Sequence, residues 1–314
     1  MRPAYYGAGW HPETPSRKDF TGDHEQVRPM YERIGLHRNG PQKIPARMDL
    51  RQWCSPVHFQ GFYNTCQAHV VTSMLELLEN RASGSTVAAS RLFLYQVTRR
   101  MLQENGDPGI YIRQMMGTLA IVGVPPEKYY PYLDVERPKD SPDPRLEQDP
   151  DAFCYAVGRN YGGLKYVRLD PSGRAPQDVL HDIRTHAAAS LPCSMGFPLY
   201  EDALVQAAGS GGRIPYAEKD ELVGTHAVLV VGYDDGMTIA NTAEHGLETV
   251  GAFLIKNSWS DRWGEKGYGW LPYEYLLAGH ARDCWIMMHP KWVETGRFDL
   301  QMNAGDSSGS PLTN

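Results

Sequence analysis

A thiol, an imidazole and two side-chain amides in this chain have types and contexts suited to covalent acyl transfer. Gln60 stands six residues before Cys66, which begins a segment with helical periodicity. His226 and Asn257 follow much later in the chain. A cysteine becomes a strong nucleophile when an imidazole takes its proton and a third group orients that imidazole. These residues therefore predict a catalytic cysteine.

The position of Cys66 favours this interpretation over that of a buried structural thiol, which is the commoner role of a free cysteine. In the first turn of a helix, a cysteine feels the positive end of the helix dipole, which stabilises a thiolate. The same helix start offers backbone N–H groups to an oxyanion, and the Gln60 amide would be a second donor.

His226 and Asn257 each have an ordinary alternative, as a histidine at a strand edge and as a turn or surface residue. His226 lies in Gly224-Thr225-His226-Ala227-Val228, where small neighbours leave room for its ring. Asn257 follows the apolar run 253–255 and could accept a hydrogen bond from the imidazole, which would fix its tautomer. Trp259 is expected either to fill the core or to shield that hydrogen bond from water.

Composition limits the function classes. The 314 residues carry a formal net charge of -6, and no Lys/Arg cluster indicates binding to nucleic acid or membrane. No apolar run approaches the roughly 20 residues that span a bilayer. The N-terminus lacks the apolar core of a signal peptide, so cytoplasm is the expected location, with unconventional export left open. Five widely spaced cysteines argue against a disulfide framework or a zinc site, and no metal or cofactor is implied.

Periodicity along the chain predicts an α+β fold in which a helical lobe precedes a strand-rich lobe. Residues 1–45 are expected to form an N-terminal arm, 46–290 the main domain and 291–314 a partly disordered tail. Within the domain, a connector at 134–151 separates the helical lobe (about 60–150) from the strand-rich lobe (about 151–290). Helices are expected over 66–84, 90–102 and 110–121, with one clear helix in the second half at 177–189. Strands are expected over 164–169, 193–197, 226–233 and 252–256, with a turn at Asp234-Asp235-Gly236.

Three blocks resemble the signature segments of papain-like cysteine peptidases. They are Gln60–Cys66, the strand around His226, and Asn257-Ser258-Trp259-Ser260-Asp261-Arg262-Trp263-Gly264-Glu265-Lys266-Gly267-Tyr268. The resemblance covers roughly residues 45–290. It implies a two-lobe papain-like fold with a helical lobe, an antiparallel barrel-like lobe and a cleft between them. It further implies peptide-bond hydrolysis through a thioester on Cys66, with Gln60 as oxyanion donor and His226 and Asn257 completing the triad.

The arm carries a narrower resemblance. Gly9-Trp10-His11-Pro12-Glu13-Thr14-Pro15 is similar to the opening of bacterial papain-like peptidases that have no long helical pro-region. This resemblance implies that residues 1–45 bind the chain's own cleft and regulate access to Cys66. An arm packed on the back of the fold is the alternative.

Some residues depart from the family pattern, and they bear on substrate range. Asn64-Thr65 replaces the usual Gly-Ser before the nucleophile, and side chains there would narrow the cleft floor. Gln67 replaces a common Trp, and Tyr63 replaces a cysteine of disulfide-containing members. The resemblance implies substrate contacts from Asn64, Thr65, Gly109, Ile110, Tyr111, Gly224, Thr225 and Trp259, with Ile110 and Tyr111 lining an apolar pocket.

The predicted function is therefore that of a hydrolase, a thiol protease acting on peptide or protein substrates as an endopeptidase. Two rivals remain from the residues alone. One is a transpeptidase or deamidase that uses the same site. The other is a degenerate module that binds peptides without cleaving them, which Asn64, Thr65 and Gln67 keep open and the intact set Gln60, Cys66, His226 and Asn257 opposes.

Overall fold

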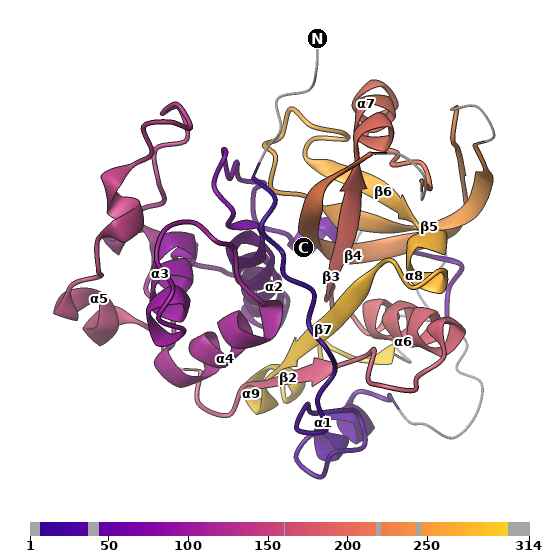
Figure 1. The fold of residues 1–314 in the computed structure, drawn as a ribbon. Helices are drawn as coiled ribbons and strands as arrows, with labels where there is room; N and C mark the ends of the chain where they lie inside the picture. The colour runs from indigo at the N-terminus through magenta and orange to yellow at the C-terminus, as the bar shows by residue number, and fades with distance from the viewer. Residues whose placement is uncertain (1–6, 37–43, 160, 218–220, 243–245, 301–314) are drawn as a thin grey trace.

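The two lobes lie side by side in a computed structural model that describes residues 7–36, 44–159, 161–217, 221–242 and 246–300 (Figure 1). The helices are α1 (Arg28–Arg33), α2 (Cys66–Ser83), α3 (Arg91–Met101), α4 (Ile112–Val122), α5 (Ala152–Val157), α6 (Pro176–Ala188), α7 (Glu201–Gly209), α8 (Glu274–Leu277) and α9 (Pro290–Val293). The strands are β1 (Arg47–Asp49), β2 (Lys165–Arg168), β3 (Cys193–Tyr200), β4 (Leu222–Ala240), β5 (Glu248–Lys256), β6 (Tyr268–Pro272) and β7 (Arg282–Met288). The α+β fold class predicted from the sequence is confirmed.

Helix α2 is the central element of the helical lobe, and its apolar residues explain both its place and its length. Residues 66–78 are all buried, so the helix is covered on every side. It ends where Gly84 takes a left-handed backbone, with φ 77°, and donates its N–H to the Asn80 carbonyl. A left-handed residue after the last turn is the usual helix stop, and glycine adopts it without steric cost.

The other three predicted helices are present as α3, α4 and α6, within two residues of their expected ends. Ser90 starts α3 by accepting the Phe93 N–H on its hydroxyl, as an N-cap does. The expectation of one clear helix in the second half was wrong, because α5, α7, α8 and α9 are also there. They span nine residues or fewer, and sequences this short carry too few turns for periodicity to reveal them.

The described strands form one antiparallel sheet in the order β2-β7-β3-β4-β5-β6, with β1 paired to β4, so the path is open rather than a closed barrel. The turn expected at Asp234-Asp235-Gly236 was also wrong. Strand β4 continues through it to Ala240, and the register with β5 shifts between Asp234 and Thr238. A β-bulge tolerates the residues that turns prefer, so they did not end the strand.

Sheet register brings the later motif residues together. In the antiparallel pair β4·β5, Leu229 lies opposite Lys256. The chain that leaves β5 at Asn257 therefore runs beside the start of β4, where His226 lies.

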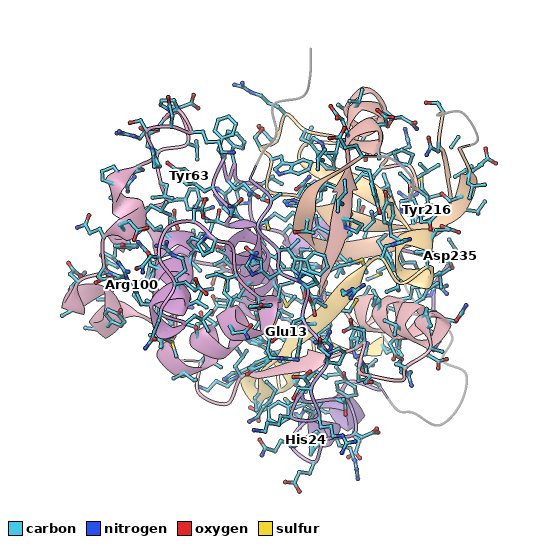
Figure 2. The ribbon with its side chains drawn as sticks, in the orientation of Figure 1. Glu13, His24, Tyr63, Arg100, Tyr216 and Asp235 are labelled. Atoms are coloured by element: carbon cyan, nitrogen blue, oxygen red, sulfur yellow. The ribbon has the colours of Figure 1, made fainter. Side chains whose placement is uncertain are left out.

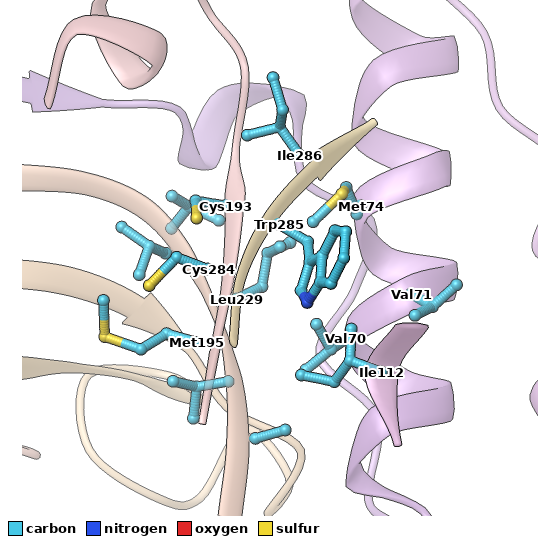
Figure 3. Close-up of a cluster of buried hydrophobic side chains, with 14 of the residues drawn as sticks. Val70, Val71, Met74, Ile112, Cys193, Met195, Leu229, Cys284, Trp285 and Ile286 are labelled. Atoms are coloured by element: carbon cyan, nitrogen blue, oxygen red, sulfur yellow. The ribbon is translucent and has the colours of Figure 1, made fainter. Parts of the chain in front are cut away.

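The two lobes meet in an apolar interface. Figure 3 shows the Trp285 indole of β7 facing α2, with Val70 and Met74 of that helix beside it and Ile112 nearby. All four side chains are at most 3% exposed. Burial of this much apolar surface fixes α2 against the sheet.

Residues after the connector remain with the helical lobe until the chain reaches β2. In α5 the Tyr155 ring lies edge-on to Phe93, at 5.1 Å between centroids, and the Cys154 thiol faces the Tyr129 carbonyl at 3.7 Å. At the far end of the chain, α9, Phe298 and Leu300 pack on the body. The predicted disorder of the tail falls mainly on residues 301–314, outside the described residues. No helix in the described ranges is long and apolar enough to cross a membrane.

Strand β5 offers a test of how the core supports the site. Phe253 is fully buried, whereas Val250 on the same strand is 59% exposed. We expect Phe253→Ala to lower the free energy of unfolding by about 3–5 kcal/mol, through lost burial and a residual cavity. Val250→Ala is expected to change it by about 0.5 kcal/mol or less. Urea denaturation followed by tryptophan fluorescence measures both, and similar losses in the two variants would contradict this account of the core.

Candidate active site

Cys66 is the first residue of α2 and is fully buried. Its own N–H and those of Gln67, Ala227 and Gly9 face the sulfur. Ala227 adjoins His226 on β4, so the thiol meets the strand-rich lobe at the position of the predicted base. Gly9 belongs to the N-terminal arm, which therefore reaches the thiol itself.

His226 and Asn257 are hydrogen-bonded to each other, with 2.8 Å between Nε2 of the imidazole and Oδ1 of the amide. The Trp259 ring stacks on the imidazole at 4.6 Å between centroids and covers this bond. Within the described part of the chain, the buried Nδ1 of His226 has no hydrogen-bond partner. Nδ1 is therefore the ring nitrogen available for proton transfer.

The Gln60 side chain is held from one side and directed into the cleft on the other. Its Oε1 accepts from the Ser258 hydroxyl at 2.5 Å, and its backbone N–H donates to the Ser258 carbonyl at 2.9 Å. Its Nε2 donates to the Tyr63 carbonyl at 2.7 Å and to the Gly7 carbonyl at 2.8 Å. The residue after Asn257 thus orients the amide, and one amide proton is bonded to a carbonyl of the arm.

Burial sets the protonation of the pair. It raises the pKa of the Cys66 thiol to about 11, although the surrounding N–H groups act to lower it. It lowers the pKa of His226 to about 4, against the hydrogen bond to Asn257, which raises it. Both groups are therefore neutral at pH 7 in this structure.

The arm runs between the two lobes as an extended segment, seen as the dark indigo trace in Figure 1. Besides the Gly7 bond to Gln60, the Ala8 N–H donates to Asn64 Oδ1 at 3.0 Å. The Gly9 carbonyl accepts from the Ile110 N–H at 3.2 Å, and the His11 N–H donates to the Ile110 carbonyl at 3.4 Å. The Gln67 amide also donates to the Gly9 carbonyl. The segment thus occupies the cleft by pairing its backbone with the helical lobe, while the Thr225 hydroxyl of the strand-rich lobe donates to the Trp10 carbonyl.

Glycine is required on both sides of this contact. A methyl group on Gly9 would lie 2.5 Å from Cβ and the carbonyl oxygen of Asn64. On the helical lobe, which faces the arm here, a methyl group on Gly109 would lie 2.0 Å from the Gly9 carbonyl oxygen. Backbone can approach backbone this closely only where no side chain intervenes.

Charged side chains hold the next part of the arm. Glu13 and Asp19 bind Arg113 of α4 at 2.5 and 2.7 Å, and Asp19 also lies 3.7 Å from Arg168 of β2. Glu13 lies near the junction of the two lobes (Figure 2). These partners are largely buried, which makes truncation of one of them more disruptive than breaking a surface ion pair.

The remaining predicted substrate contacts fall into two groups. Ile110, Asn64, Gly224 and Thr225 line the cleft against the arm, and Tyr111 contacts His11 edge-on at 5.2 Å. Thr65 does not line the cleft floor, because its fully buried hydroxyl bonds the Tyr132 hydroxyl inside the helical lobe.

Sequence reasoning did not predict the contacts that four further residues make. Gln67 binds the arm and the Ile110 carbonyl, Ser258 orients Gln60, and Trp10 and Asp283 are paired beneath the cleft. Ser258 lies in the Asn257-Ser258-Trp259 segment, so its place in the motif could have indicated a role at the site. No sequence pattern could have predicted the contacts of Gln67 and Asp283 with the arm, because these contacts depend on where the arm lies.

Two open pockets are lined by residues of the candidate site, and the larger of them also by the arm. One of about 620 Å³ is lined by Ala8, Asn64, Asp107, Arg137 and Val223 among others. The second, of about 490 Å³, is lined in part by Phe59, Val135, Trp259 and Trp263. Space for further substrate residues is therefore present near Asn64 on one side and Trp259 on the other.

Comparison with known proteins identifies the family. Residues 44–290 match the family model described as papain family cysteine protease. The chain belongs to the papain family of cysteine proteases. Among solved structures, this papain-family protease is similar to xylellain, a cysteine protease from Xylella fastidiosa, with a TM-score of 0.68, 28% identity, and coverage of 90% of this chain and 96% of that one.

Curated relatives agree on the family. The protease is 27% identical over 248 residues to an uncharacterized peptidase C1-like protein of Acanthamoeba polyphaga mimivirus, covering 76% of this chain and 72% of the relative. It is 26% identical to pro-cathepsin H of Mus musculus, over 74% of this chain and 61% of the relative. The match thus spans less than two thirds of the cathepsin precursor's length.

The seating of the arm predicts a change in thiol chemistry. In the wild-type protein, alkylation of Cys66 by iodoacetamide is expected to rise with pH without a plateau up to about pH 11, because only the thiolate reacts. Gly9→Ala should unseat the arm sterically and admit water. We expect its Cys66 to react at pH 7 faster by about 10-fold or more, since each unit of lowered pKa gives tenfold more thiolate.

Mass spectrometry of the Cys66 peptide, sampled over time at each pH, provides the rates. Glu25→Ala is the matched control, because Glu25 is exposed on the arm away from the cleft. Coinciding pH profiles for wild type and Gly9→Ala would show that the arm does not control the thiol.

Proposed function

We propose that this protease is an endopeptidase whose cleft is closed by its own arm until the arm is displaced. One observation carries the proposal. An extended peptide, residues 7–11, lies across the candidate site with a carbonyl on the Gln60 amide, an N–H on the Cys66 sulfur and backbone bonds to Ile110. A surface that binds peptide backbone in this way suits a peptide substrate.

In the proposed reaction, Cys66 passes its proton to Nδ1 of His226 and attacks the substrate carbonyl carbon. The carbonyl π electrons move to oxygen, which accepts hydrogen bonds from Gln60 Nε2 and the Cys66 N–H. As the tetrahedral intermediate collapses, the C–N bond breaks and His226 donates its proton to the departing amine. A thioester on Cys66 remains.

Hydrolysis of the thioester repeats the sequence with water. His226 takes a proton from water, the hydroxide attacks the thioester carbon, and the Cys66 sulfur leaves and regains the proton. Throughout, Asn257 Oδ1 accepts the Nε2–H bond and keeps Nδ1 directed to the reacting atoms. Trp259 excludes water from that bond by stacking on the ring.

The arm keeps this machinery at rest by occupation and by desolvation. The Gly7 carbonyl uses a hydrogen-bond donor that the oxyanion needs. Burial beneath the arm also favours the neutral thiol and imidazole over the charged pair. Displacement of residues 7–11 would free the donor and let water stabilise the thiolate and imidazolium.

An active-site label tests the assignment of roles. With Gly9→Ala protein and an epoxysuccinyl peptide near pH 6, we expect one label, on Cys66. His226→Ala is expected to reduce the labelling rate by about 100-fold or more, the usual scale for losing a general base. Labels located by mass spectrometry and spread over several cysteines would overturn the proposal.

Cys54→Ala serves as control, because Cys54 is another free cysteine, is not fully buried, and should leave the labelling unchanged when replaced.

Product analysis tests the reaction type. We expect Gly9→Ala protein to cut an internally quenched peptide at an interior bond and to release a free carboxylate, because water is the acceptor. Cys66→Ala in the same background should reduce the rate to the uncatalysed level. Mass spectrometry with and without an added amine identifies the acceptor, and an amide as main product would indicate acyl transfer to amines instead.

A further inference from the structure

The side chain of Trp10 fills a pocket beside the nucleophile. The Trp10 carbonyl accepts a hydrogen bond from the hydroxyl of Thr225, the neighbour of His226, at 2.6 Å. The N–H of the preceding residue, Gly9, faces the Cys66 sulfur. The indole lies against Gly196 of β3, where a methyl group would come 2.0 Å from Cε2 of the ring. With 2% of its surface exposed, Trp10 is enclosed as a bound ligand would be.

A carboxylate closes the end of this pocket. Asp283 of β7 is 1% exposed, and its Oδ2 accepts from the Trp10 indole N–H at 2.9 Å and from the Glu13 N–H at 3.0 Å. Both donors belong to the arm. Asp283 also holds a left-handed backbone, with φ 59°, fixed by a bond from its N–H to Asp170. Strained backbone of this kind is retained where it orients a functional group.

The charges around the pocket favour a neutral donor over a cation. Arg168 already binds Oδ1 of Asp283 at 2.8 Å and Asp170 at 3.0 Å, and Arg113 lies over the neighbouring Trp285 ring at 5.4 Å. When the arm leaves, Glu13 and Asp19 leave with it. Two arginines then face two carboxylates, so the vacated pocket has one unsatisfied carboxylate oxygen but no net negative charge to attract Lys or Arg.

We infer that this pocket receives a substrate side chain and that Asp283 makes it select a flat aromatic ring bearing an N–H, tryptophan above all. The inference rests on the proposed peptidase function. It adds a polar group to the apolar pocket that the sequence led us to expect beside Ile110 and Tyr111. Asp283 is thus a specificity-determining residue.

The physical basis is the cost of leaving a buried acceptor without a donor. A phenylalanine or aliphatic side chain would fill the space and bury Oδ2 of Asp283 unsatisfied. Sites built to hydrogen-bond a substrate group reject analogues that lack it more strongly than apolar pockets reject a missing methylene. We expect about 10- to 100-fold in kcat/KM between rings with and without the N–H.

A pair of peptides tests the inference without altering the enzyme's pocket. Internally quenched peptides would carry, at each position in turn, tryptophan or 3-benzothienylalanine, in which sulfur replaces the indole N–H. The full-length Gly9→Ala/Trp10→Ala chain is the enzyme, so that the arm neither blocks the cleft nor supplies a competing indole. At one position, the tryptophan peptide should be cleaved about 10- to 100-fold faster. Equal rates at every position would overturn the inference.

A variant checks that Asp283 is responsible. In Asp283→Asn, Arg168 retains the amide oxygen as its acceptor, and the amide NH₂ turns toward the pocket, where it cannot accept the indole N–H. The ratio between the two peptides should fall to about 1. A ratio that stays high would assign the selectivity elsewhere. If the variant does not fold, the comparison of the two peptides on the enzyme with Asp283 intact still decides.

Binding separates failure of this inference from failure of the proposed reaction. With Cys66→Ala added, the same peptides labelled with a fluorophore give dissociation constants by anisotropy. Suppose that the tryptophan peptide binds more tightly but the enzyme that retains Cys66 does not cleave it. This result would overturn the proposed reaction and support the proposed selectivity of the pocket. Cleavage without any preference would support the reaction and overturn the pocket. Absence of binding by either peptide would count against the pocket as well.

Discussion

The packing of α2 on the strand-rich lobe is the constraint on which the site depends. Cys66 and His226 come from different lobes, and the apolar interface, with Trp285 against Val70 and Met74, holds one lobe against the other. A close-packed interface resists small displacements, so it holds reacting atoms more accurately than a few hydrogen bonds would. The sheet then sets the second relation, because β4 and β5 are paired in a register that places Asn257 beside His226.

Local signals made much of this predictable from the sequence. The run of apolar residues after Cys66 and the glycine at its end specify α2, and the β-branched run at 228–231 specifies the middle of β4. The motifs also pointed to side chains that the fold brings together, such as His226 and Asn257. Features that depend on tertiary contacts were not predictable. Asp234-Asp235-Gly236 has turn residues yet stays in a strand, since pairing with β5 resumes beyond it. Thr65 turns inward because Tyr132 supplies a partner.

The arm shows the same limit more sharply. Sequence reasoning left it between the cleft and the back of the fold, since extended segments carry no periodicity that names their partner. Its path is set by the close backbone contact between Gly9 and Gly109 and by the indole of Trp10. The carboxylates of Glu13 and Asp19, which bind Arg113, fix the next part of the arm. Each is an ordinary surface residue in isolation. Together they fit the complementary surface of this one cleft.

A peptide segment joined to the body that it occupies competes at a concentration set by the length of its tether. Short flexible tethers already give about millimolar effective concentrations, and the chain next to this segment is in addition held by Glu13 and Asp19. A substrate must compete with the arm at that effective concentration. A weakly binding peptide at micromolar concentration would therefore not displace the arm from the cleft. The hydrogen bond between Trp10 and Asp283 contributes to the affinity of the arm for the cleft. That affinity sets how tightly an outside peptide must bind before the nucleophile is reached.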